Sequence, residues 1–290
     1  MSDKTKYILF LLLASTVILS VIGVLLFLIQ SGRVAVFSPK GAVALAERDL
    51  ILDTLLVMLI IVIPVFIFIF SFTWKFRADN LEAKYTPDWT HNTRYELMWW
   101  IPPFVIIFVL GVMTWKSTHQ LDPYRPLISN VPPITIEVVA LDWKWLFIYP
   151  EQNIATVNFV EFPVNTPINF LITGDAPMNS FWIPQLGGQI YAMAGMKTQL
   201  HLIANETGNF NGASANYSGR GFSGMKFIAH ATTQDDFSAW VASTKNAPAI
   251  LDNEEYSKLR EQSENDPVRY YSAAEENLFD SIIMRYMMPH

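Results

Sequence analysis

Residues 134–149 carry the sequence ITIEVVALDWKWLFIY, and this stretch decides the fold of the larger part of the chain. Its first six residues alternate between apolar and polar side chains, which is typical of a β-strand with one buried face. The aromatic-rich residues from Trp143 to Tyr149 indicate a second strand directly after the first. The stretch therefore predicts two consecutive strands of a β domain.

Further strand-like runs follow along the chain, at residues 168–173, 189–193, 199–204 and 226–231. Turn-forming residues separate these runs, and the stretch 219–224 before the last one is rich in glycine. Short strands at a spacing of roughly 8–12 residues are typical of an antiparallel sandwich or barrel. We therefore predict an all-β sandwich over residues 119–232.

A helical extension is predicted after the sandwich, over residues 233–290. Thr233 precedes an amphipathic run, and Asp236 stands at the distance that a capping box requires. Residues 252–262 and 274–287 are predicted to form two more amphipathic helices. The C-terminal part of the chain is thus expected to be helical and not to belong to the sheets.

Three long uncharged runs precede the sandwich and predict a membrane anchor. Their lengths are 23, 21 and 19 residues, and they are Tyr7 to Ile29, Thr54 to Trp74 and Leu97 to Trp115. A helix needs about 20 apolar residues to cross the hydrocarbon core, so each run is long enough. We expect a transmembrane hairpin over residues 50–118, with helices at about 50–74 and 97–115.

The first run has two interpretations. Lys4 and Lys6 followed by an apolar stretch also describe a secretory signal peptide, but 23 residues exceed its usual core of about 7–15 residues. We favour a retained helix at 7–29 within an N-terminal region that extends to residue 49.

Basic residues orient membrane helices, because the cytoplasmic side carries the excess of Lys and Arg. With three spans, six basic residues share the side of the N-terminus and three lie in the opposite loop; the six are Lys4, Lys6, Lys75, Arg77, Lys84 and Arg94. This distribution places the N-terminus in the cytoplasm and the sandwich outside the membrane.

Composition excludes several classes of protein. Only 16% of the 290 residues are charged and 51% are hydrophobic, which excludes a disordered chain, and no basic surface is available for nucleic acid. The chain has no Cys, which removes disulfides, thiolate metal sites and Cys nucleophiles. Residues 1–115 hold 9 basic and 8 acidic side chains, whereas residues 116–290 hold 11 basic and 18 acidic ones. The outer part of the chain is therefore acidic.

Few side chains point to chemistry of their own. The five His do not pair at the spacing of metal ligands, so we expect satisfied or solvent-facing imidazoles. Trp143 and Trp145 alternate along the predicted strand and would share one face of it. They indicate either a sandwich core or domain-contact face, or a docking patch for a partner protein.

Several long motifs give the chain a resemblance to a known family. They run from about Pro39 to Ala231 and include residues 83–89, 134–152, 178–184, 189–196 and 217–227. In these motifs the chain resembles subunit II of the haem-copper respiratory oxidases. Within that superfamily, it resembles more closely subunit II of the cytochrome bo-type ubiquinol oxidases. The resemblance implies a cupredoxin-like sandwich in the periplasm and a multi-pass anchor in the bacterial inner membrane.

The cytochrome c-using branch of that family has a two-copper centre in the sandwich, and the resemblance allows its ligand positions to be compared. The places of its two His, two Cys and one Met are taken here by Asn179, Tyr217, Gly221, Met225 and Ile228. Copper of that kind needs soft thiolate donors, which this chain lacks. We therefore expect no cofactor in this chain and no electron transfer from cytochrome c.

The resemblance places the haems, the copper and the ubiquinol site in subunit I. It implies that this chain is a structural subunit, without a catalytic centre, of a proton-pumping ubiquinol:oxygen oxidoreductase. Its expected partners are subunit I, the smaller membrane subunits and lipid. A free-standing, membrane-anchored and metal-free cupredoxin with a binding or assembly role is the alternative.

Glu96 is the last charged residue before the third apolar run. Its plain interpretation is a carboxylate near a helix N-terminus, where the helix dipole favours negative charge. The resemblance adds a second one, because a glutamate ahead of this Trp and Pro pattern lies at the mouth of a proton-uptake channel of subunit I. Ionisable groups near membrane depth often mark such relays. Glu96 is therefore our candidate for a proton-uptake residue.

Overall fold

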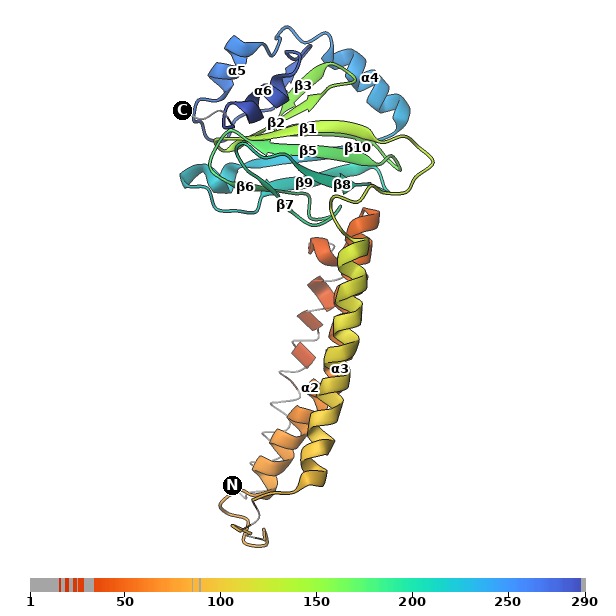
Figure 1. Cartoon of the computed structure of the whole chain (residues 1–290), viewed down its shortest axis with the longest axis vertical. Coiled ribbons are helices and arrows are strands. Elements are labelled where there is room, and N and C mark those ends of the chain that lie inside the picture. The colour runs from red at the N-terminus through yellow and green to blue at the C-terminus, as the bar shows by residue number, and fades with distance from the viewer. Residues whose placement is uncertain are drawn as a thin grey trace. The chain divides into compact units, whose positions relative to one another are not determined.

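The computed structural model describes residues 34–287, except residues 85 and 89, and a few positions between residues 16 and 28. The helix predicted at 7–29 lies mostly outside the described residues. The described chain forms two compact units (Figure 1). One unit is Ala46–Asp122, and the other combines the residues before it with those from Pro123 onward.

Two long antiparallel helices account for the first unit, namely α2 (Ala42–Lys75) and α3 (Thr93–Gln120) (Figure 1). Both are longer than predicted, because charged residues beside the apolar runs continue the helices instead of ending them. The start of α3 is fixed by Asn92, whose side-chain oxygen accepts the backbone N–H groups of Arg94 and Tyr95 at 3.1 and 3.3 Å. At about 1.5 Å per residue, each helix is longer than the roughly 30 Å hydrocarbon core.

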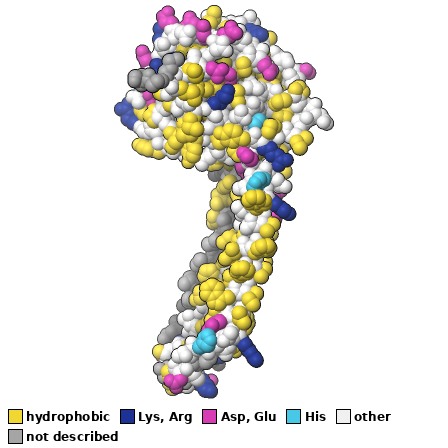
Figure 2. Space-filling view, in the orientation of Figure 1, with side chains coloured by type: hydrophobic (Ala, Val, Ile, Leu, Met, Phe, Trp, Pro, Cys, Tyr) yellow, Lys and Arg dark blue, Asp and Glu magenta, His cyan; other side chains and the backbone are white. Residues whose placement is uncertain are grey.

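The side chains of this hairpin are apolar and mostly exposed. In α2 only Ala44 is buried among the described residues, and in α3 none is. Figure 2 shows hydrophobic side chains along the visible face of the hairpin. Both helices are long and apolar enough to cross a membrane. Apolar surface on this scale requires lipid or a partner protein to cover it.

The second unit is a β-sandwich of two sheets. The six-stranded sheet has the order β11-β3-β2-β1-β5-β8. Its strands are β1 (Ile134–Leu141), β2 (Lys144–Tyr149), β3 (Ile154–Val157), β5 (Ile168–Gly174), β8 (Thr198–Leu202) and β11 (Arg269–Tyr271). The five-stranded sheet has the order β4-β10-β9-β6-β7. Its strands are β4 (Phe159–Pro163), β6 (Asn179–Trp182), β7 (Ile190–Ala192), β9 (Gly208–Ser214) and β10 (Lys226–Thr232).

Strand pairing is mixed. The pairs β1–β5 and β4–β10 are parallel, while the other paired strands run antiparallel. The sandwich and the two apolar helices before it confirm the predicted fold class for the described part of the chain.

Aromatic side chains fill the space between the two sheets. The rings of Phe181 and Phe227 stack with centroids 5.1 Å apart, and Trp145 meets Phe181 edge-on at 5.3 Å. Trp145 is fully buried and Trp143 is only 6% exposed. Burial leaves neither indole on the surface, so the structure favours the core interpretation of the two Trp residues over the docking patch.

Within the C-terminal extension, residues 233–287, the part from Ala249 onward covers the outer face of the six-stranded sheet, whereas Phe237 of the first helix packs in the core between the sheets. It contains α4 (Gln234–Thr244), α5 (Asn253–Leu259), β11 and α6 (Leu278–Met284). Thr233 caps α4, and its hydroxyl accepts the N–H of Asp236 at 3.2 Å as the capping box predicts. The helices predicted at 252–262 and 274–287 are shorter than expected, and β11 was not predicted.

A second apolar cluster lies between this extension and the sheet. Sheet side chains such as Leu141, Leu146 and Ile148 pack in it with extension side chains such as Leu259 and Phe279. The six-stranded sheet is thus buried on both faces. This is why β1 is largely buried and β2 completely so, although the alternation in residues 134–139 predicts one solvated face.

Residues 38–45 belong to the same unit as the sandwich, which the predicted boundary at residue 49 did not anticipate. The backbone N–H of Lys40 donates to Gln185 O at 2.7 Å, and Lys40 O accepts the N–H of Asn205 at 2.8 Å. Lys40 also forms an ion pair with Glu206 at 2.6 Å. These backbone bonds tie the segment before α2 to the sandwich loops.

Candidate functional site

Two loops at the β5–β6 and β9–β10 connections hold the positions that correspond to copper ligands. Asn179 begins β6 and is 1% exposed. Its Nδ2 donates to Pro177 O at 2.7 Å, and its Oδ1 accepts a hydrogen bond from Ser214 Oγ at 2.8 Å. Both ends of the amide are therefore already bonded within the protein.

Hydrogen bonds join the two loops to each other. The N–H of Ala215 donates to Ser180 O at 3.0 Å, and Asn216 Nδ2 donates to Met178 O at 2.9 Å. Beyond them, Tyr217 is 76% exposed and its ring meets Phe222 at 5.6 Å.

The remaining positions do not supply a set of donors. Met225 is 1% exposed, and Ile228 lies within β10 opposite Phe159. Gly221 and Ile228 carry no donor atom at all. The five predicted positions thus lie in the expected loops and strand, but they do not form a ligand set.

Trp143 closes this end of the sandwich. It lies in the turn between β1 and β2 with a positive φ of 61°, and its indole Nε1 donates to Ser218 O at 3.1 Å. Its ring lies against Gly221, where an added Cβ would be 2.3 Å from the indole Cδ2. A Cys at this position would need the ring to move, so these residues do not fit a thiolate-bridged copper centre.

The sequence did not reveal why the stretch 219–224 requires glycine. Gly221 has no room for a side chain. Gly219 has a φ of 115°, and a Cβ added to it would lie 3.1 Å from the same indole. The glycines were visible in the sequence, but the ring that requires them comes from a residue about 75 positions earlier. No local signal connects the two.

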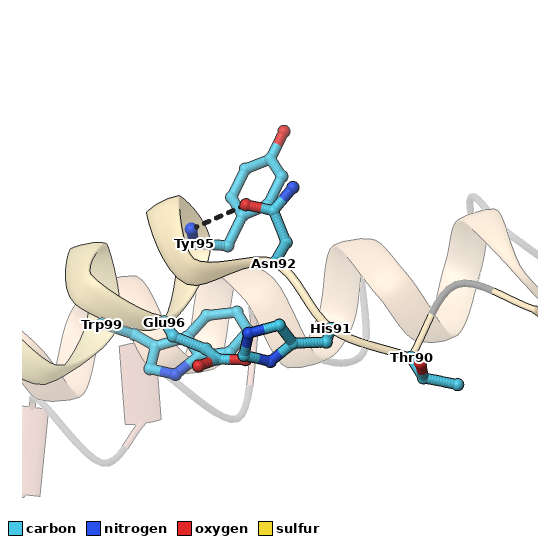
Figure 3. A pocket seen from close by; sticks show the side chains of 6 residues that line it. All are labelled: Thr90, His91, Asn92, Tyr95, Glu96 and Trp99. Atoms are coloured by element: carbon cyan, nitrogen blue, oxygen red, sulfur yellow. Dashed lines mark hydrogen bonds and ion pairs between the residues drawn. The ribbon is translucent and has the colours of Figure 1, made fainter.

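A shallow pocket of about 210 Å³ lies at the N-terminus of α3 in the hairpin unit (Figure 3). Its lining consists of Thr90, His91, Asn92, Tyr95, Glu96 and Trp99. His91 Nδ1 and Glu96 Oε1 are 2.5 Å apart, and the other ring nitrogen of His91 lies 3.3 Å from Thr93 Oγ1. Figure 3 shows the imidazole beside the carboxylate of Glu96.

This pair combines a carboxylate with the side chain best suited to exchange protons near neutral pH. The side chains of His91 and Glu96 are 67% and 38% exposed, so water reaches both. Glu96 also lies in the first turn of α3, where the helix dipole favours its charge.

The sequence analysis expected His91 to be satisfied or solvent-facing and did not pair it with Glu96. The available signal was a His directly before the capping Asn92, because the cap turns the chain so that the imidazole faces the first helical turn. Two other imidazoles are satisfied as expected: His201 Nδ1 lies 2.9 Å from Pro123 O, and His230 Nδ1 lies 3.2 Å from Glu161 Oε2. Within the described residues, no three His, Asp or Glu side chains gather as a metal site.

Comparisons with known proteins agree on one family. The family described as "Cytochrome C oxidase subunit II, periplasmic domain" matches residues 151–232, and "COX Aromatic Rich Motif" matches residues 245–290. The cytochrome bo(3) ubiquinol oxidase subunit 2 of Pseudomonas putida is 57% identical over 248 residues, or 86% of this chain and 79% of that protein. The ubiquinol oxidase subunit 2 of Acetobacter aceti is 50% identical over 253 residues, or 87% of this chain and 82% of that protein.

One solved structure is similar over part of the chain. It is the periplasmic domain of subunit II of cytochrome oxidase from Bradyrhizobium japonicum, with 21% sequence identity and a TM-score of 0.39. The match covers 41% of this chain and 96% of the other.

Two apolar helices followed by a cupredoxin-like sandwich define a membrane-anchored protein of the cytochrome oxidase subunit II class. Within that class, the chain belongs to the family of ubiquinol oxidase subunit 2. It is therefore a subunit of a quinol oxidase complex, as the resemblance implied.

Proposed function

We propose that this chain is a structural and assembly subunit of a proton-pumping ubiquinol:oxygen oxidoreductase and carries no electron itself. The observation that carries the proposal is the closed end of the sandwich, where the Trp143 ring fills the space beside Gly221. The amide of Asn179 is bonded on both sides, and the sequence has no thiolate. Electrons then enter the complex from ubiquinol through subunit I, which holds the haems and copper, and not from cytochrome c.

The proposed topology places the N-terminus in the cytoplasm and the sandwich in the periplasm of the inner membrane. The distribution of basic residues supports it. The family description of the sandwich as a periplasmic domain supports it as well. In this orientation the N-terminus of α3, with His91 and Glu96, faces the cytoplasm.

Glu96 serves as a proton-uptake residue in this proposal, with His91 as its partner. The imidazole Nδ1 lies at hydrogen-bond distance from the carboxylate, and water reaches both groups from the exposed side. The pair thereby keeps a proton available at the cytoplasmic surface for a polar path in subunit I. The 2.5 Å separation and the exposure of both side chains support this role.

Purification of the complex through a tag on this chain tests the proposal. We expect a haem-bearing protein and smaller subunits at fixed stoichiometry, with ubiquinol oxidation but no oxidation of reduced cytochrome c. Copper added to the complex should bring no new visible absorption from this subunit. A tagged chain that assembles without any haem protein would instead support a free-standing binding or assembly protein.

A further inference from the structure

Residues 260–266 follow α5 in the C-terminal extension and contact both loops of the closed end. Residues 174–179 form the first loop, and residues 215–225 form the second. Figure 1 shows the extension on the sandwich, with α5 and α6 close to the strands of the six-stranded sheet. The contacts of this segment are distributed over three points, each with its own charged residue.

Asp175 is the contact in the first loop. Its side chain is completely buried, and Arg260 Nε lies 2.7 Å from its Oδ2. Every side-chain partner of Asp175 in the described chain comes from the C-terminal extension; the others are Tyr256 at 2.6 Å, Tyr286 at 2.5 Å and Arg285 at 3.2 Å. A buried carboxylate without partners is costly, so this loop depends on the extension for its charge balance.

Lys144 is the contact beside Trp143. Its side chain is 2% exposed, and its Nζ lies 2.9 Å from Asp266 Oδ2. It also donates to Glu261 O at 2.9 Å and to the hydroxyl of Ser263. Lys144 directly follows Trp143, whose ring lies against Gly221 in the second loop. Through Lys144, the segment 260–266 therefore anchors the turn that carries the Trp143 ring.

Arg220 and Gly224 are the contacts in the second loop. Arg220 Nε lies 2.5 Å from Glu264 Oε1. A Cβ on Gly224 would lie 2.4 Å from Asn265 Oδ1, so the two segments are in van der Waals contact. The Arg220 side chain is 85% exposed and contributes little stability by itself. The close packing of the Asn265 side chain against Gly224 makes this contact specific.

We infer that residues 260–266 act as a brace that holds both loops and the Trp143 turn in one fixed arrangement. Three points of contact on separate segments prevent the loops from moving independently. Two of the points involve a buried charge of the sandwich, namely the carboxylate of Asp175 and the ammonium group of Lys144. The brace thereby makes the end of the sandwich a rigid surface, and Arg260, Glu264 and Asp266 are its positioning residues. This inference goes beyond the proposed function and does not require it.

Hydrogen exchange of the full-length protein in its purified complex, measured peptide by peptide, tests the brace. Arg260→Gln and Glu264→Gln each remove one contact while leaving the buried core intact, and Lys144→Met removes the strongest. We expect exchange in residues 174–179 to rise about fivefold in Arg260→Gln. Exchange in residues 215–225 should rise about twofold in Glu264→Gln and about tenfold in Lys144→Met.

Lys258→Gln is the matched control, because Lys258 belongs to the same extension and forms its ion pair, among the described residues, with the exposed Glu254 at 2.8 Å. It should leave both loops at their original exchange rates. The two mild variants keep the test valid if Lys144→Met does not fold. Unchanged exchange in both loops of folded Arg260→Gln and Glu264→Gln proteins would overturn the brace, whether or not the complex still oxidises ubiquinol.

Discussion

The sandwich and the hairpin differ in the burial and pairing of their charged groups. In the sandwich, Asp175 and Lys144 are buried and fully engaged by the C-terminal extension. In the hairpin, the side chains of His91 and Glu96 are open to water, and the apolar side chains are exposed. Buried charges that are paired within the protein hold a structure together, whereas exposed polar groups remain accessible to water or to a partner. This difference is the basis of our proposal that the sandwich serves architecture and the hairpin serves proton uptake.

Removal of residues 245–290 is expected to have the largest effect, because it breaks the internal closure of the sandwich. The outer face of the six-stranded sheet would lose its cover, including Leu141, Leu146 and Ile148. Each buried aliphatic side chain contributes about 1.5–3 kcal/mol, so the total loss approaches the entire stability of a domain. Limited proteolysis of the truncated protein should show rapid cleavage within the sandwich.

A protein shortened only by its last three residues is the control for this truncation and should resist the protease. If the sandwich without residues 245–290 stayed protease-resistant and kept its melting temperature, the closed character of this region would be wrong. The extension would then be an attachment and not part of the core.

Gly221→Ala is expected to have the next largest effect. The new Cβ would lie 2.3 Å from the Trp143 ring, and overpacking of this kind costs about 2–3 kcal/mol. Thermal unfolding followed by circular dichroism should show a lower melting temperature. Ser218→Ala is the neighbouring control, since its buried hydroxyl has no partner within the described residues, and it should be neutral. An equally stable Gly221→Ala protein would mean that the indole does not close this position.

Glu137 gives a smaller effect that depends on pH. Burial, together with the smaller effect of nearby Asp280, raises the pKa of the Glu137 carboxyl from 4.5 to about 7, although Lys197 opposes the shift. The folded protein therefore binds a proton that the unfolded chain has already lost between these pH values. Stability is highest below pH 4.5 for this group and falls as the pH rises through 7.

Glu137→Gln should remove this pH dependence and stabilise the protein at pH 8 by about 1 kcal/mol, because solvent screens a partly exposed carboxyl. Melting temperatures between pH 5 and 8 measure the effect. Glu254→Gln, at an exposed position of α5, should retain the wild-type dependence. Parallel curves for wild type and Glu137→Gln would show that Glu137 ionises normally in the folded protein.

Local patterns were sufficient to predict most of the fold. Uncharged runs predicted α2 and α3, alternation predicted β1, and Thr233 with Asp236 predicted the start of α4. These features are visible because the residues involved are neighbours in the sequence. The ends of α2 and α3 were predicted wrongly, because a charged residue beside an apolar run can continue the helix as well as end it.

Long-range contacts account for what the sequence did not reveal. Asp175 and Arg260 are 85 positions apart, and the short strand β11 forms only because it pairs with β3. The burial of both faces of β2 depends on an extension that was expected to be merely helical. Among the candidate site residues, Glu96 was proposed by resemblance, but its contact with His91 was not predicted, because the two meet only once Asn92 caps α3.

The rate of ubiquinol oxidation by a fully assembled Glu96→Gln complex tests the central claim most directly, namely that this subunit contributes proton chemistry through its hairpin. Gln keeps the size of the side chain but cannot titrate. With haem content and subunit ratio unchanged, we expect turnover to fall about tenfold or more across pH 6–9, as for loss of a proton-transfer group. Glu82→Gln in the loop before α3 should keep the wild-type rate. A wild-type rate in Glu96→Gln at every pH would contradict the account and leave the carboxylate only its favourable place at the helix N-terminus.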